Sequence, residues 1–190
     1  MKYGGNSKTA ILNFASYKEA GGKFLEGSSA QEESLCHNSF LYNVLSKFNR
    51  YYSWNNSHLN RGLYTNRALY SPDIIFFKND KEVKCNVITC AAPNFSVAQR
   101  FNSVSKVENS KALISRIRFV LDIAKDNKIE TLILGAYGCG VFKQDSYEVA
   151  SIFRVLLLSH YRDCFKKVIF AIPNGTNFLN FKLAFSKVEE

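Results

Sequence analysis

Residues 131–161 read TLILGAYGCGVFKQDSYEVASIFRVLLLSHY, which is an apolar run, a glycine-rich segment and a helical pattern in that order. Residues 131–136 are mostly apolar without alternation, as expected for a strand that is covered on both faces. Apolar residues then recur at helical spacing from about residue 146 to residue 161. A strand, a glycine loop and a helix in this order form a unit that often binds phosphate, so the stretch predicts an α/β fold.

Other parts of the chain continue this alternation. Four further apolar runs predict strands: residues 9–15 (TAILNFA), 74–77 (IIFF), 83–91 (VKCNVITCA) and 167–172 (KVIFAI). Residues 111–127 keep helical spacing, with Arg116, Arg118 and Lys125 predicted on the outer face. Residues 49–66 show no period and predict a long loop. We therefore expect one α/β domain that spans all 190 residues.

Composition excludes several classes of protein. Hydrophobic residues make up 46% and charged residues 22% of the chain, and no apolar stretch approaches the length of a membrane span. Residues 1–10 lack the apolar core of a secretory signal, so we expect a cytoplasmic protein without a membrane partner. Five cysteines without a C-x-x-C pair and three histidines without ligand spacing argue against a disulfide framework and a metal site.

The formal net charge of +9 creates a positive field that attracts polyanions. The lysines and arginines are dispersed along the chain, however, and a dispersed basic surface is usually only a solvated one. A nucleic-acid-binding protein that uses this surface and the aromatic residues at 51–54 is therefore the least favoured interpretation. We expect no direct binding of nucleic acid.

Two segments contain residue types suited to chemistry. Residues 13–33 read NFASYKEAGGKFLEGSSAQEE, a strand that continues through a glycine-containing loop into a helix. Ser29 and Glu32 fit a capping box, and Leu41, Val44, Leu45 and Phe48 mark the predicted buried face of the helix it opens. Two interpretations stay open from these residues: Glu32 caps the helix and Glu33 is solvated, or the two carboxylates do chemistry.

The second segment, GAYGCGVF at residues 135–142, matches neither of the common nucleotide-binding fingerprints. Closely spaced glycines ahead of a helix can direct several N–H groups at an anion. Val141 and Phe142 would then cover a sugar or a base. The alternative is a tight turn that places Phe142 in the core.

Several stretches together resemble the poly(ADP-ribose) glycohydrolases, particularly the short microbial type. GGKFLEGSSAQEE at residues 21–33 resembles the GGG…QEE motif of that family, and LGAYGCGVF at residues 134–142 resembles its glycine loop. Further likenesses follow in the same order: Leu41-Tyr42, Tyr70-Ser71-Pro72, VITCAAPN at residues 87–94, and Arg116-Ile117-Arg118. The resemblance implies a macrodomain-like fold, which is a three-layer α/β/α sandwich with a central mixed sheet.

The resemblance also implies an ADP-ribosyl glycohydrolase that cleaves ribosyl O-glycosidic bonds of poly- or mono-ADP-ribose without a metal or cofactor. Glu33 would protonate the leaving oxygen, and Glu32 would hold the neighbouring ribose. A carboxylic acid can supply this proton, although a helix N-terminus favours the ionised form. The implied contacts of ADP-ribose, or of an ADP-ribosylated macromolecule, are Asn13, Gly21, Gly22, Lys23, Gln31, Gly138, Cys139, Gly140, Val141 and Phe142.

Two features depart from the family pattern. Lys23 stands where the motif has a third glycine, so the loop opens slightly, Lys23 turns outward, or Lys23 engages a phosphate. The chain also begins close to the strand that leads to the motif, which makes the predicted domain short at its N-terminus. Both features favour the alternative function, a catalytically weak module that binds ADP-ribose without turnover. In either case we expect a monomer.

Overall fold

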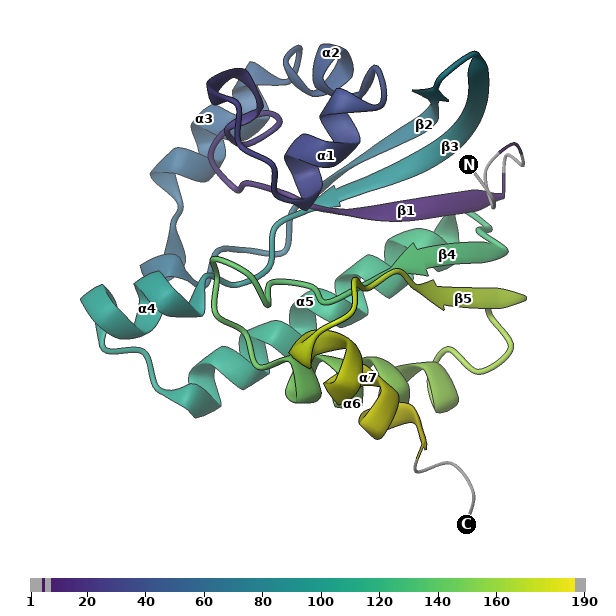
Figure 1. The fold of residues 1–190 in the computed structure, drawn as a ribbon. Coiled ribbons are helices and arrows are strands. Elements are labelled where there is room, and N and C mark those ends of the chain that lie inside the picture. Colours follow the sequence, from purple (N-terminus) through teal and green to yellow (C-terminus); the bar gives the residue numbers. More distant parts are fainter. Residues whose placement is uncertain (1–4, 6–7, 187–190) are drawn as a thin grey trace.

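Five strands form one mixed sheet in the order β2-β3-β1-β4-β5, with helices on both of its faces (Figure 1). The computed structural model describes residue 5 and residues 8–186. The strands are β1 (Thr9–Phe14), β2 (Ala68–Lys78), β3 (Lys81–Cys90), β4 (Thr131–Leu134) and β5 (Lys167–Phe170). The helices are α1 (Gln31–His37), α2 (Leu41–Leu45), α3 (Asn49–Ser57), α4 (Phe95–Asn102), α5 (Lys106–Asp126), α6 (Ser146–Leu158) and α7 (Thr176–Ser186), with two short 3₁₀ turns, η1 (Phe24–Glu26) and η2 (Asn60–Gly62).

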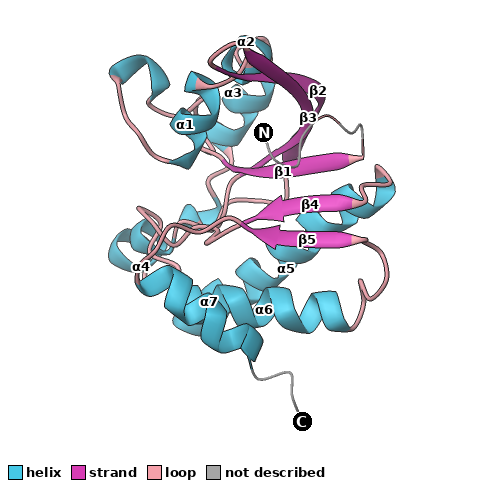
Figure 2. Cartoon of the chain, turned by 45° about the vertical axis from the view of Figure 1, so that its right-hand side comes forward, coloured by secondary structure: helices cyan, strands magenta, loops and turns pink. Residues whose placement is uncertain are grey.

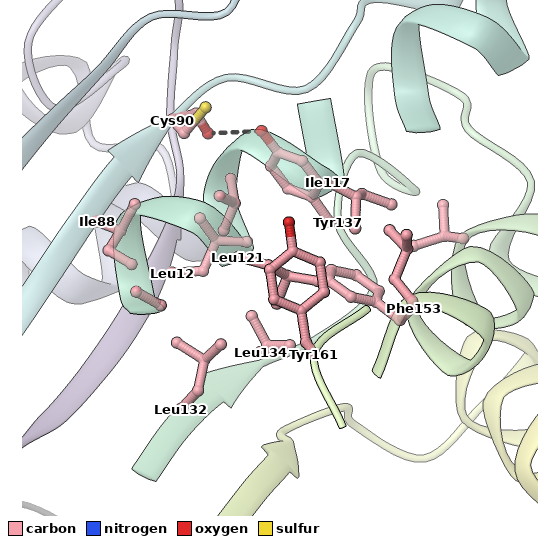
Figure 3. Packing of buried hydrophobic residues seen from close by; sticks show 14 of the residues in the cluster. Leu12, Ile88, Cys90, Ile117, Leu121, Leu132, Leu134, Tyr137, Phe153 and Tyr161 are labelled. Carbon is pink, nitrogen blue, oxygen red and sulfur yellow. Dashed lines mark hydrogen bonds between the residues drawn. The ribbon is translucent and has the colours of Figure 1, made fainter. Parts of the chain in front are cut away.

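The strands bury alternate side chains in two cores. Leu12 of β1 belongs to a large core shared with α5, α6 and α7, whereas the adjacent Ile11 packs into a smaller core with α1 and α2. Figure 3 shows the large core, in which Leu12 and Ile88 of the strands lie near Ile117 and Leu121 of α5. The expected three-layer α/β/α sandwich with a central mixed sheet is confirmed.

Strand direction determines where ligands can bind. β1, β3, β4 and β5 run parallel, and only β2 pairs in the antiparallel direction, with β3. The chain leaves β1 toward α1–α3 on one face and reaches α5 on the other face after β3 (Figure 2). The segments that follow the four parallel strands therefore meet at one edge of the sheet, beside a switch point of the kind where open α/β sheets bind ligands.

The five predicted strands are present, but the long loop predicted for residues 49–66 is wrong. Residues 49–57 form α3 and residues 60–62 form η2. The buried residues of α3 are one aromatic, Tyr52, and one amide, Asn55, and the Asn55 amide donates to the Tyr17 carbonyl at 2.7 Å. A helix that buries polar groups lacks the apolar stripe by which sequence periodicity detects helices.

The helix predicted to continue from the QEE segment is also divided. α1 ends at His37 and a separate short helix, α2, begins at Leu41. Leu41 and Leu45 are buried as predicted, whereas Phe48 follows the helix and is exposed.

Among the described residues, no helix is both long and apolar enough to span a membrane. The same residues contain no group of three or more His, Cys, Asp or Glu side chains placed to hold a metal ion. All five cysteines are free thiols.

Candidate active site

The first residue of α1 ties the helix to the end of β1. The Gln31 side chain accepts a hydrogen bond from the Phe14 N–H at 2.8 Å and donates one to the Leu12 carbonyl at 2.9 Å. The Gln31 side chain thus makes, at the end of β1, the backbone hydrogen bonds that a neighbouring strand would otherwise make. This pair of bonds fixes the start of α1, and with it the next two residues.

Glu32 is only 3% exposed. Its carboxylate accepts hydrogen bonds from the Ser16 N–H at 2.6 Å and from the Asn13 amide at 3.1 Å. The predicted capping box of Ser29 and Glu32 is therefore wrong: α1 begins after Ala30 without a side-chain cap, because the carboxylate binds the loop after β1 instead. Burial raises the pKa of Glu32 to about 7, and the hydrogen bond from the Ser16 N–H opposes this rise only in part. A carboxyl group with this pKa is partly protonated near neutral pH.

Glu33 is 6% exposed and accepts a hydrogen bond from the Lys23 N–H at 2.9 Å. Lys23 itself has a φ of −99°, which suits any L residue. Its exposed ammonium group pairs with Glu26 at 3.0 Å. Of the three possibilities for Lys23, the structure shows the side chain turned outward, and the backbone at this position supports Glu33.

Gly22 lies between the two carboxylates. A β-carbon at this residue would stand 2.6 Å from Glu33 Oε1 and 3.1 Å from Glu32 Oε2. The φ of Gly22 is +57°, a conformation that strongly favours glycine. Because only a residue without a side chain fits here, the loop after β1 closes directly over the carboxylates.

The glycine loop after β4 packs on the loop after β3. Gly138 has a φ of +74°, and a β-carbon there would stand 2.7 Å from the Ala92 side chain and 2.9 Å from Gln144. The buried Gln144 amide donates to the Pro93 carbonyl at 2.8 Å. These contacts fix the backbone of the loop, whereas Gly140 has no neighbour within 4 Å of its β position and stays open.

Three aromatic rings lie beside the carboxylates. Tyr17 and Tyr64 are buried and stack at 4.1 Å between ring centroids. Phe142, at the end of the glycine loop, meets Tyr64 edge-on at 6.1 Å. Phe142 thus packs both against the small cluster of Tyr17, Tyr64 and Ala91 and against the edge of the main core.

Three adjoining cavities run along the ends of the strands. The carboxylate cavity, about 670 Å³, contains Glu32 and Glu33. The glycine-loop cavity, about 190 Å³, lies beside residues 138–142. The outer groove, about 570 Å³, lies between residues 29–34 and residues 171–177. Phe14 lines all three, so the cavities adjoin one another, and together we call them the groove.

Most of the predicted site residues line this groove: Gly22, Lys23, Gln31, Glu32, Glu33, Gly138, Gly140, Val141 and Phe142. Three others lie behind its surface. Asn13 is fully buried and supports Glu32, Gly21 packs closely against the Tyr42 ring, and Cys139 contacts the Tyr137 carbonyl.

Arg116 is a supporting residue that the sequence interpretation placed wrongly. It was predicted on the outer face of its helix, yet it is only 1% exposed and donates hydrogen bonds to the carbonyls of Leu63 and Ala91. Both carbonyls belong to segments that border the carboxylate cavity. The spacing contained the signal, because Arg116 follows Leu113 by three residues and precedes Val120 by four, which places all three on one helix face.

Comparisons with known proteins agree with this geometry. The family model described as microbial-type PARG, catalytic domain, matches residues 1–79. The poly(ADP-ribose) glycohydrolase of Deinococcus radiodurans in complex with ADP-ribose superposes with a TM-score of 0.89 and 35% identity, over 96% of this chain and 77% of that chain. The Thermomonospora curvata enzyme gives 0.86 and 32%, over 94% of this chain and 68% of that chain.

A third structure, the T. curvata enzyme bound to the inhibitor ADP-HPD, also gives a TM-score of 0.86 and 32% identity, over 94% of this chain and 71% of that chain. No curated protein sequence matches significantly. Identity above 30% over most of both chains, together with the matching motif at the start of α1, shows common descent and not only a common fold. The chain belongs to the microbial-type poly(ADP-ribose) glycohydrolase family.

Proposed function

We propose that this protein hydrolyses the ribosyl O-glycosidic bond of ADP-ribose groups by general acid/base catalysis. One observation carries the proposal: two buried carboxylates, Glu32 and Glu33, converge on Gly22 in a cavity that continues into the glycine loop. The D. radiodurans relative in complex with ADP-ribose and the T. curvata relative bound to ADP-HPD support the same class of ligand.

The order of the cavities matches the order of chemical groups in ADP-ribose. The diphosphate lies against the backbone of residues 138–142, where Gly140 is open and a helix begins at Ser146. The adenosine then lies in the outer groove, and the terminal ribose lies between Phe142 and Glu32. This placement brings the anomeric carbon of the ribose to Glu33.

In this mechanism Glu33 donates its proton to the leaving oxygen as the anomeric C–O bond breaks, and the electron pair of that bond stays on the oxygen. The ribosyl group passes through an oxocarbenium-like state. Glu33 then takes a proton from the water that attacks the anomeric carbon, which restores the acid. Glu32, held by Asn13 and Ser16, orients the ribose hydroxyls. Neither a metal nor a cofactor takes part.

The alternative function, a module that binds ADP-ribose without turnover, rested partly on Lys23. The backbone N–H of Lys23 supports Glu33 and its side chain turns away, so this departure from the family motif leaves the carboxylates in place. Lys23 therefore does not favour the alternative.

The test is turnover by the purified protein, by Glu33→Gln and by Glu26→Gln as a matched control on an exposed carboxylate of the neighbouring loop. Each is incubated with poly(ADP-ribose) and with mono-ADP-ribosylated protein, and release of free ADP-ribose is followed. We expect release by the wild type and by Glu26→Gln, and none by Glu33→Gln. Binding of ADP-ribose without release by the wild type would instead establish the binding module.

A further inference from the structure

Two buried side-chain amides lie behind the glycine loop, and neither residue lines any of the three cavities. Asn109 of α5 is 2% exposed, and Gln144, between the glycine loop and α6, is 4% exposed. The Asn109 amide donates to Gln144 Oε1 at 2.8 Å, and the Gln144 amide donates back to Asn109 Oδ1 at 2.9 Å. The two side chains therefore form a closed ring of hydrogen bonds, which we call the amide pair.

The amide pair determines which way the Gln144 amide faces. Asn109 presents one donor and one acceptor, so both hydrogen bonds form in only one orientation of the Gln144 side-chain amide. In that orientation Gln144 Nε2 also donates to the Pro93 carbonyl at 2.8 Å. A side-chain amide nitrogen has two N–H donors, and Gln144 uses both inside the protein. Asn109 thus holds Gln144 on the segment that follows β3.

Gln144 in turn holds the backbone of the glycine loop. Its backbone N–H donates to the Gly138 carbonyl at 3.1 Å, which closes the loop on itself. Its side chain lies against Gly138, where a β-carbon would stand 2.9 Å from Gln144 Cγ. A shift of the Gln144 side chain would therefore displace the backbone of residues 138–142, the stretch proposed above to bind the diphosphate.

Asn109 is anchored independently of this loop. Its helix, α5, begins with a capping box formed by Ser105 and Glu108. Further along the same helix, Leu113 and Ile117 are fully buried in the large core. A helix that is capped at its start and packed into the core is a rigid support for side chains that hold a binding site from behind.

We infer that Asn109 is a positioning residue for the diphosphate and acts through Gln144 on the glycine loop. The inference rests on the proposed function, because it takes this loop as the place where the diphosphate binds. The effect of Asn109 is specific to the phosphate groups, since the outer groove proposed for the adenosine contains neither member of the amide pair. Even a small displacement of a group that holds a ligand is costly, so loosening the pair weakens binding of the diphosphate.

The experiment compares the affinity for ADP-ribose with the affinity for adenosine, which has no phosphate, in the wild type, Asn109→Leu, Gln144→Met and the double variant. Leucine and methionine keep the approximate size of the replaced side chains and remove the amide group. Asn86→Leu is the control, because Asn86 is another buried amide, 3% exposed, whose hydrogen bonds to the backbone of Thr9 and Asp73 involve residues outside the groove. Calorimetry measures the binding of ADP-ribose, and NMR titration measures the weaker binding of adenosine.

We expect Asn109→Leu and Gln144→Met each to weaken the binding of ADP-ribose about tenfold and to leave the affinity for adenosine unchanged. The double variant should lose no more affinity than Gln144→Met alone, because Asn109 acts through Gln144. Asn86→Leu should change neither affinity, although it also removes buried hydrogen bonds. Equal losses for the two ligands, or additive losses in the double variant, would overturn the inference.

Two other outcomes separate the role of Asn109 from the proposed function. Failure of the wild type to bind ADP-ribose would overturn the proposed function, and the role of Asn109 with it. An affinity for ADP-ribose that is unchanged in Asn109→Leu would overturn the role of Asn109 alone. Thermal unfolding shows whether each variant is folded at the temperature of the titrations. If Asn109→Leu is not, Asn109→Ser, which keeps a hydroxyl group for one of the two hydrogen bonds, replaces it with the same expectations.

Discussion

A β-carbon on Gly22 would lie 2.6 Å from the Glu33 carboxylate. A single methyl group at this residue would therefore clash with the carboxylate in its present position. Gly22→Ala is expected to displace the carboxylate and to lower kcat by roughly a hundredfold, since small misplacements of a catalytic group cost this much. The positive φ adds a loss of about 1–2 kcal/mol in the free energy of unfolding. Steady-state kinetics and chemical denaturation measure the two effects.

Gly27→Ala is the matched control for this substitution. Gly27 also has a positive φ, +79°, but nothing lies within 4 Å of its β position. Gly27→Ala should therefore lose similar stability and keep its kcat. Equal kcat values for the two variants would show that the contact at Gly22 does not hold Glu33.

The buried carboxyl of Glu32 makes stability depend on pH. Its pKa is about 7 in the folded protein, against an ordinary value of 4.5, so the folded state binds more protons than the unfolded state between these values. The contribution of Glu32 to the free energy of unfolding is complete below its ordinary pKa of 4.5. This contribution falls by up to about 3 kcal/mol as the pH rises through 7. Glu32→Gln stays neutral and should flatten this decline. Urea unfolding of both proteins at pH 5 and pH 8 would test this; parallel declines would contradict it.

Among the secondary-structure elements, the sequence predicted those that carry a recognisable pattern of apolar residues. The continuous runs at residues 9–15 and 131–136 led to β1 and β4, because strands covered on both faces carry little else. α3 was missed because its buried residues are a single aromatic, Tyr52, and a polar amide, Asn55. One buried ring and one buried amide do not form the repeating apolar pattern that reveals a helix.

The sequence predicted which segments border the groove, but not the groups that hold the two carboxylates in place. The QEE and glycine-loop segments were recognisable from their resemblance to a known family. Besides the Asn13 amide, however, the groups that hold the carboxylates are the backbone N–H groups of Ser16 and Lys23. Every residue except proline has such a donor, so no residue type marks where one will be used.

Arg116 connects α5 to the segments that line the site. Its guanidinium donates to the Leu63 and Ala91 carbonyls and to the Asn66 side chain. Arg116→Met leaves these acceptors without their donor and should lower the free energy of unfolding by about 3 kcal/mol. The KM for an ADP-ribosylated substrate should rise, because the freed segments border the carboxylate cavity. Unfolding and steady-state kinetics measure both.

Arg118→Met on the same helix is the control for this prediction. Arg118 is exposed, so its loss should change the free energy of unfolding by less than about 0.5 kcal/mol and leave KM unchanged. Similar effects of the two substitutions would mean that Arg116 acts through helix stability alone and does not position the segments beside the site.

For the whole molecule, the net charge of +9 predicts how a polyanionic substrate is captured. A positive field accelerates the encounter with a polymer of phosphates and is screened by salt. The KM for poly(ADP-ribose) should therefore rise several-fold from low to high ionic strength, with little change in kcat. A mono-ADP-ribosylated peptide, which carries fewer charges, should show a weaker dependence. Equal salt dependence for both substrates would mean that the charge acts only at the bound diphosphate.

The hydrogen bonds of the QEE segment have an evolutionary consequence. Gln31, Glu32 and Glu33 each accept a hydrogen bond from a different backbone N–H group, those of Phe14, Ser16 and Lys23. Natural selection for a folded protein would therefore retain all three residues even in a descendant that no longer turned over its substrate. The Val141 side chain, in contrast, is apolar and 77% exposed on the glycine loop, so it forms no such hydrogen bond. In descendants that have lost catalytic activity, amino-acid substitutions should therefore accumulate at Val141 before they appear at Glu32 or Glu33.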